Sequence, residues 1–171
     1  KEYFDVYAVL TVSKREKLMT DTALQTGGEV DRFILHHDLV EAYAKKIPAI
    51  NNDMSNTHIL VILNDKSGIR ANCSWTSYGS MSCANIIMED NSNRFDGVIR
   101  HEVLGHGFGR LADEYVETPM PGSENTFIDF PEEYKQGIWD EHKRGWYLNV
   151  DVTNDPEKIV WKDFLSNPDY A

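Results

Sequence analysis

The sequence predicts an α/β (α+β) fold, in which a few strands and two helices are followed by an irregular C-terminal part. Two observations carry this prediction. Short runs of β-branched, aromatic or aliphatic residues are separated by clusters of Asn, Asp, Ser and Gly, which is typical of strands joined by turns. Two longer segments have helix-capping residues at their start and a proline or glycine at their end. At 171 residues the chain has the length of one domain, which we expect to span residues 1–171.

Three segments have the composition of strands. Residues 4–12 are rich in β-branched and aromatic side chains. Residues 58–63 form a continuous apolar run, which indicates a buried central strand. Residues 81–88 predict another strand directly before the second helix. These three segments are the expected strands of the sheet.

Two helices are expected in the first two thirds of the chain. The first covers residues 38–47, with Asp38 as its N-cap and apolar residues on one side. The second begins near Arg94, after a turn-forming cluster of Asp, Asn and Ser. It is expected to end near Gly109, because Gly107 and Gly109 lie so close together that they interrupt a helix.

The second helix carries the run His-Glu-Val-Leu-Gly-His, residues 101–106. A catalytic zinc ion takes three N or O ligands and keeps one position open for water, and a neighbouring carboxylate then acts as general base. His101 and His106 are five residues apart, whereas the usual zinc peptidase pattern places two histidines four apart on one helix face. In an α-helix, five residues leave the second side chain about 140° from the first. The sequence therefore predicts a one-residue π-bulge, which Gly105 would tolerate.

A third metal ligand is expected after the glycine break. The chain can turn back there and bring Asp113 or Glu114 beneath the metal, and the residue types leave both open. The competing interpretation is an ordinary amphipathic helix with two surface histidines and a solvated acidic end. The order of the features, from His-Glu through a second His and a glycine break to a carboxylate, favours the metal site.

The run from His101 to Tyr115, with its ending Leu-Ala-Asp-Glu-Tyr, resembles the bacterial IgA-peptidase family of zinc metallopeptidases. The family motif normally has the four-residue spacing. The five-residue spacing is similar to that of dipeptidyl peptidase III, a local parallel over six residues in which both histidines bind zinc. Further similarity to the IgA-peptidase family covers three segments, namely residues 6–9, 59–65 and 149–165.

The resemblance implies a zincin/metzincin-like catalytic domain with a mixed twisted sheet. It assigns the third ligand to Asp113, and it makes residues 79–84 the edge strand that pairs with extended substrate. Metzincins also place a methionine turn beneath the zinc. Met120 is the only methionine after the motif, so either Met120 makes this turn or the segment that carries it is missing. In the family the turn follows the region of residues 161–162, so we favour a domain truncated at its C-terminal end that belongs to a longer multidomain chain. The family further implies a secreted or bacterial cell-surface protein.

The sequence therefore predicts a zinc-dependent endopeptidase that acts on a protein or peptide substrate. Zn²⁺ held by His101, His106 and Asp113 would polarise the scissile carbonyl, and Glu102 would be the general base. Tyr115 is the nearest tyrosine that could stabilise the oxyanion. The alternative is a non-catalytic zincin-like module for adhesion or glycan binding. The added residue between the histidines favours this alternative, whereas a glutamate at position 102 argues against it.

The composition argues against some binding partners and does not decide whether the two cysteines are bonded. A formal net charge of −11 and a pI near 4.9 argue against nucleic acid as a binding partner. No apolar stretch reaches the length of a transmembrane segment.

Cys73 and Cys83 could close a disulfide loop or remain free thiols. His36 and His37 precede the first helix, where capping or loop roles are commoner than metal binding. A helix start at residues 131–133 and a final short helix from residue 155 are expected in the irregular part.

Overall fold

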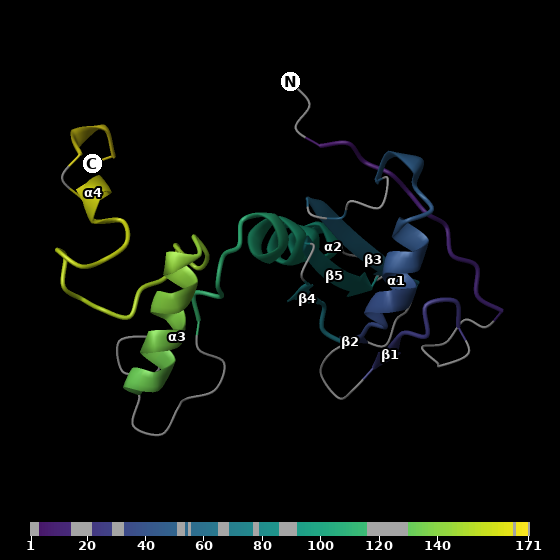
Figure 1. The fold of residues 1–171 in the computed structure, drawn as a ribbon, viewed down its shortest axis with the longest axis horizontal. Coiled ribbons are helices and arrows are strands. Elements are labelled where there is room, and N and C mark those ends of the chain that lie inside the picture. The colour runs from purple at the N-terminus through teal and green to yellow at the C-terminus, as the bar shows by residue number, and fades with distance from the viewer. Residues whose placement is uncertain are drawn as a thin grey trace. The chain divides into compact units, whose positions relative to one another are not determined.

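The computed structural model describes residues 4–14, 22–28, 33–50, 54, 56–64, 69–76, 79–85, 92–115, 130–165 and 167–170. They form a mixed α+β protein with a small mixed sheet and several helices (Figure 1). The chain divides into two compact units, residues 1–108 and 109–171, and each is described by itself. The expectation of a single catalytic domain stays a prediction.

The main sheet of the first unit has the strand order β3–β5–β4. Strand β3 (Thr57–Leu63) runs parallel to β5 (Gly79–Asn85), and β4 (Asn72–Trp75) runs antiparallel to it. Because β5 is paired on both sides, the prediction that residues 79–84 form the substrate-pairing edge is wrong. The outer antiparallel position in the described sheet belongs to β4. A separate antiparallel pair joins β1 (Gly27–Gly28) to β2 (Phe33–Ile34).

Close approach of β3 and β5 depends on the first residue of β5. A Cβ atom on Gly79 would lie 2.1 Å from the carbonyl oxygen of Thr57, so only glycine fits there. The strand prediction for residues 58–63 is confirmed, but β3 lies at one side of the described sheet and not at its centre. The prediction for residues 81–88 is confirmed for the part that β5 covers, and residues 86–88 lie outside the described residues.

The strand prediction for residues 4–12 is wrong. These residues form no strand in the described structure, and several of their apolar side chains are exposed, among them Val6 at 88% and Leu10 at 87%. Composition suits a strand, but a strand exists only where a neighbouring strand takes up its backbone hydrogen bonds. The described part of the chain supplies no such neighbour for these residues.

Helix α1 (His37–Ala44) begins one residue earlier and ends three residues earlier than predicted. Its N-cap is His36, without a side-chain hydrogen bond, so the expected capping role of Asp38 is wrong. Asp38 lies in the first turn, where its charge still favours the helix dipole. A short 3₁₀ turn, η1 (Pro48–Ile50), follows.

The core of the first unit lies on one face of the sheet. Val40 of α1 packs there with Phe33, Val61 and Met81, all buried. Five partly buried apolar residues surround them: Leu24, Leu35, Ile59, Leu63 and Ile69. The side chains of β5 alternate between the two faces of the sheet. Met81 faces this core, whereas the buried Ser80 and Ser82 form hydrogen bonds with other elements.

Helix α2 (Ser92–Ile99) continues directly into the π-helix η2 (Arg100–Phe108). The predicted start near Arg94 and end near Gly109 are therefore correct to within two residues. The π-helix packs against β3, β4 and β5.

The second unit is built from helix α3 (Glu132–Lys143), helix α4 (Lys162–Leu165), the 3₁₀ turn η4 (Pro168–Tyr170) and irregular segments. The helix start predicted at residues 131–133 is confirmed, with Pro131 as the N-cap. The final helix begins at Lys162, seven residues later than predicted, because residues 155–160 form turns instead. Met120 lies outside the described residues. No helix in the described ranges is long and apolar enough to cross a membrane.

Candidate metal site

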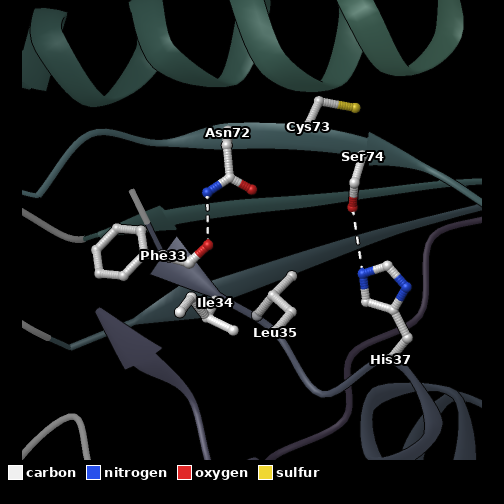
Figure 2. Close-up of a pocket in the computed structure, with 7 residues that line it drawn as sticks. All are labelled: Phe33, Ile34, Leu35, His37, Asn72, Cys73 and Ser74. Atoms are coloured by element: carbon white, nitrogen blue, oxygen red, sulfur yellow. Dashed lines mark hydrogen bonds between the residues drawn. The ribbon is translucent and has the colours of Figure 1, made fainter. Parts of the chain in front are cut away.

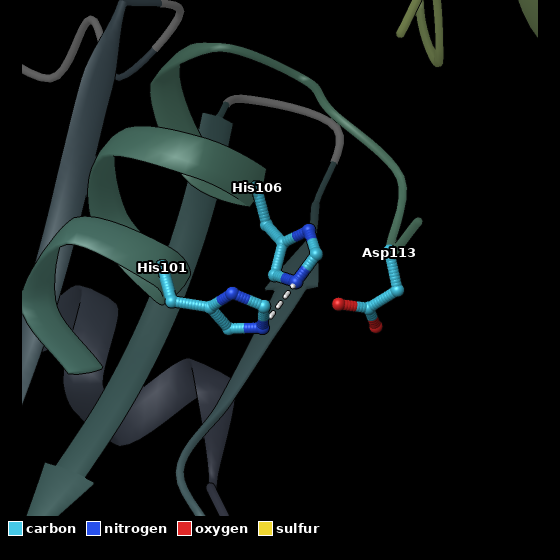
Figure 3. A group of neighbouring side chains, drawn as sticks. All are labelled: His101, His106 and Asp113. Atoms are coloured by element: carbon cyan, nitrogen blue, oxygen red, sulfur yellow. Dashed lines mark hydrogen bonds between the residues drawn. The ribbon is translucent and has the colours of Figure 1, made fainter. Parts of the chain in front are cut away.

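The π-helix brings the two motif histidines together. The Nε2 atoms of His101 and His106 are 3.1 Å apart, and their rings meet edge to face with centroids 4.5 Å apart (Figure 3). Hydrogen bonds from residue i to i+5 place side chains five residues apart nearly above one another. The predicted π-type backbone is therefore confirmed, but its predicted extent is wrong, because η2 is a π-helix of nine residues and not a one-residue bulge.

The sheet below η2 accommodates this helix through small side chains. A Cβ atom on Gly107 would lie 2.9 Å from Ser80 Oγ and 3.2 Å from the carbonyl oxygen of Glu102. Ser80 is fully buried, and its hydroxyl shares a hydrogen bond with Nδ1 of His58. The Ser82 hydroxyl donates to the Glu102 carbonyl oxygen at 3.2 Å. Glycine on the helix and serine on β5 thus allow the close packing that supports the histidine-bearing turn.

Asp113 completes a group of three ligand-type side chains. Each of these side chains offers one ligand atom, and the three atoms lie within 4.8 Å of one another; the residues are His101, His106 and Asp113. Figure 3 shows the carboxylate directed toward the two imidazole rings. Asp113 follows the helix on an irregular segment that starts with Arg110, whose φ of +55° turns the chain sharply.

The donor set of this group fits a divalent metal ion. Zinc–imidazole bonds measure about 2.0–2.1 Å, so two nitrogens 3.1 Å apart would subtend about 98° at such an ion. The three ligand atoms lie within 4.8 Å of one another, so the Asp113 carboxylate lies close enough to be considered as a third ligand of the oxygen type that such sites use. Two imidazoles and one carboxylate also suit other transition metals. The group could hold a metal ion, and nothing in the structure identifies it as zinc.

The two candidates for the third ligand, Asp113 and Glu114, have different surroundings. Asp113 lies with the histidines, whereas the Glu114 carboxylate accepts a hydrogen bond from Asn149 Nδ2 at 3.3 Å. Tyr115 is half exposed, and its role toward an oxyanion stays a prediction.

Glu102, the expected general base, is buried, with 7% of its surface exposed. Burial raises the pKa of the Cys73 thiol on β4, and the negative charge of Glu102 raises it further, while hydrogen bonds with Ser82 and Ser80 oppose the increase. Cys73 is a free thiol, so the free-thiol alternative holds for this residue. The group of His101, His106 and Asp113 that the described structure brings together does not include Glu102, so its role as general base stays a prediction.

A shallow cavity of about 330 Å³ lies on the other side of β4 (Figure 2). Figure 2 shows Cys73 pointing toward the helix, while Asn72 and Ser74 point the opposite way. Asn72 Nδ2 donates to the Phe33 carbonyl oxygen at 3.0 Å, and Ser74 Oγ lies 3.4 Å from His37 Nε2. His37 thus contacts β4 on the side away from the helix, and the described structure gives it no place in the metal-binding group.

Comparison with known proteins gives no match: no family model, no curated protein and no solved structure is similar to this chain. The resemblance to the IgA-peptidase family therefore stays a prediction that rests on the motif residues.

The residues that support the site are not among those predicted from the sequence. The alternation Ser80-Met81-Ser82 was a usable pattern, because small polar residues on one face of a strand predict close packing against it. Asn149 gave no comparable pattern. It lies 37 residues from its partner Ala112, and only folding brings the two together.

Proposed function

We propose that this chain carries the catalytic centre of a zinc-dependent endopeptidase with a zincin/metzincin-like arrangement. The observation that carries the proposal is the convergence of His101, His106 and Asp113 on a π-helix and the segment that follows it. The next residue after the first histidine is Glu102, a carboxylate where metal-assisted hydrolysis needs a base. A purely structural metal site has no use for such a residue.

Each residue of the centre has a separate task in this proposal. His101, His106 and Asp113 hold the ion, which when bound supplies a Lewis acid and lowers the pKa of a coordinated water. Glu102 accepts a proton from the attacking water and delivers it to the leaving amine. Tyr115 is proposed to stabilise the oxyanion.

The proposed substrate is an extended segment of a protein or peptide. Strand β4 is the outer antiparallel strand of the described sheet, and η2 packs against it. A peptide that adds to β4 by backbone hydrogen bonds would therefore run beside the helix that carries Glu102. Secretion or attachment to a bacterial cell surface, and membership of a longer multidomain chain, are parts of the same proposal that rest on the family resemblance.

Metal content tests the centre directly. Protein purified without added zinc is expected to contain stoichiometric zinc, which is lost in His106→Ala and Asp113→Ala. His37→Ala is the matched control, since His37 contacts β4 away from the group. Zinc retained at the wild-type level in His106→Ala would refute this metal site.

Hydrolysis of a quenched-fluorescence peptide library tests the base. Glu102→Gln keeps the shape of the side chain but cannot accept the proton, so turnover is expected to fall by about 10²–10⁴-fold with zinc content unchanged. Full activity in this variant would remove Glu102 from the mechanism. A wild-type protein that binds zinc but cleaves no peptide would instead support the non-catalytic binding module.

A further inference from the structure

The side chain of Asn149 is bound to the backbone next to Asp113. Its Oδ1 accepts a hydrogen bond from the Ala112 N–H at 2.9 Å, and its Nδ2 donates to the Ala112 carbonyl oxygen at 2.8 Å. The same Nδ2 lies 3.3 Å from Oε1 of Glu114. One amide thus contacts the residues on both sides of Asp113.

The neighbouring residues strengthen this attachment. The Tyr147 N–H donates to the Arg110 carbonyl oxygen at 2.8 Å. The Arg110 guanidinium lies over the Trp146 ring at 5.3 Å, and Arg144 lies over it at 4.1 Å. Arg110 and Tyr147 both have positive φ angles, +55° and +56°, which non-glycine residues adopt only where surrounding contacts hold them. The segment that carries Asp113 is therefore fixed by polar and stacking contacts and not by a regular element.

We infer that Asn149 is a positioning residue for the metal ligand Asp113. This inference rests on the proposed metal centre. The two histidines are held by a packed helix, but Asp113 lies on an irregular segment whose orientation depends on Ala112. An asparagine amide has both a donor and an acceptor, so it can satisfy the N–H and the C=O of one residue at once. Partners beyond the direct ligands fix ligand orientation, and their loss typically weakens metal binding by about 10–100-fold.

The test is zinc affinity measured by competition with a chelator. Asn149→Ala is expected to weaken zinc binding by about 10–100-fold. Asn149→Asp has the same shape and keeps the acceptor for the Ala112 N–H, but it loses the donor and adds charge beside Glu114, so it is also expected to bind zinc more weakly. Asn72→Ala is the matched control, because it removes another amide-to-backbone hydrogen bond, on β4, and should leave zinc affinity unchanged.

A second measurement separates positioning from general stability. The visible spectrum of the Co²⁺-loaded protein reports coordination geometry, and it is expected to change in both Asn149 variants but not in Asn72→Ala. Unchanged zinc affinity and an unchanged cobalt spectrum in a folded Asn149 variant would overturn the inference, while zinc loss in His106→Ala would still uphold the metal centre. Absence of zinc binding in the wild type would overturn the metal centre and this inference together.

Discussion

Helices η2 and α3 obtain their shape in opposite ways. Helix η2 is a π-helix that packs on the sheet, with Glu102 and Gly107 buried. Helix α3 is a regular α-helix with no buried residue. Its side chains form ion pairs three residues apart, such as Lys135–Glu132 and Lys143–Asp140.

The difference shows which forces determine each geometry. In α3, acidic residues in the first turn and basic residues in the last follow the helix dipole, and ion pairs between neighbouring turns add small increments. In η2, hydrogen bonding of the π type is less favourable locally and persists because Ser80, Ser82 and Gly107 fit together beneath it. The π-helical geometry of η2 is thus held by packing, whereas the solvated helix α3 is held by local interactions.

Gly107→Ala is expected to have the largest effect on the free energy of unfolding. The added methyl would lie 2.9 Å from Ser80 Oγ and 3.2 Å from the Glu102 carbonyl oxygen, so the buried Ser80 side chain or the backbone of η2 must shift. We expect the free energy of unfolding, measured by urea titration, to fall by about 1–3 kcal/mol. Zinc affinity should fall with it, because His106 is the preceding residue.

Two further variants sharpen that result. Gly97→Ala, in the α2 part of the same continuous helix, meets no atom within 4 Å and should raise stability instead. Adding Ser80→Ala to Gly107→Ala removes the closest atom, so the double variant should be more stable than the sum of the single changes predicts. If Gly107→Ala and Gly97→Ala had equal effects, packing against β5 would not be what constrains η2.

Gly137→Ala in α3 is expected to have an intermediate effect on the free energy of unfolding. A Cβ atom there meets nothing within 4 Å, and alanine has the higher helix propensity. The free energy of unfolding of the second unit should rise by about 0.5–1 kcal/mol, with zinc affinity unchanged. Hydrogen exchange of the α3 amides measures this locally. Faster exchange in the variant would show that α3 depends on contacts other than its own backbone.

The smallest effect is expected for Asp140→Asn. Hydrogen bonds from Lys143 and then Gln136 hold the pKa of Asp140 below its ordinary value. A lowered pKa in the folded state stabilises the protein above the unfolded pKa of about 3.9, and this contribution is lost as the pH falls through the lowered value.

Thermal unfolding between pH 2 and pH 7 measures that contribution. The wild type should unfold at a slightly higher temperature than Asp140→Asn near pH 7, and the difference should vanish at the acidic end and shrink in high salt. A difference that is constant across this range would show that the charge of Asp140 is not involved.

The sequence by itself determined the local features of this protein. It predicted β3, β5, α1, α3 and the long helix through the motif, since these depend on residue composition, capping and prolines or glycines within a few positions. It also predicted a π-type irregularity, because histidines five residues apart do not align on an α-helix. His101 and His106 were named from their residue types and order, whereas the family resemblance chose Asp113 over Glu114; the structure brings the three named side chains together.

Only the tertiary structure decided how these elements combine. Residues 4–12 have a strand composition but no partner strand in the described structure, and β5 lies between two strands instead of at the edge. Asn149, which contacts Ala112 and Glu114 on either side of Asp113, is brought to Ala112 by folding from 37 residues away. Strand order, edge position and the orientation of a loop ligand are set by contacts between distant residues, and such contacts leave no local pattern in the chain.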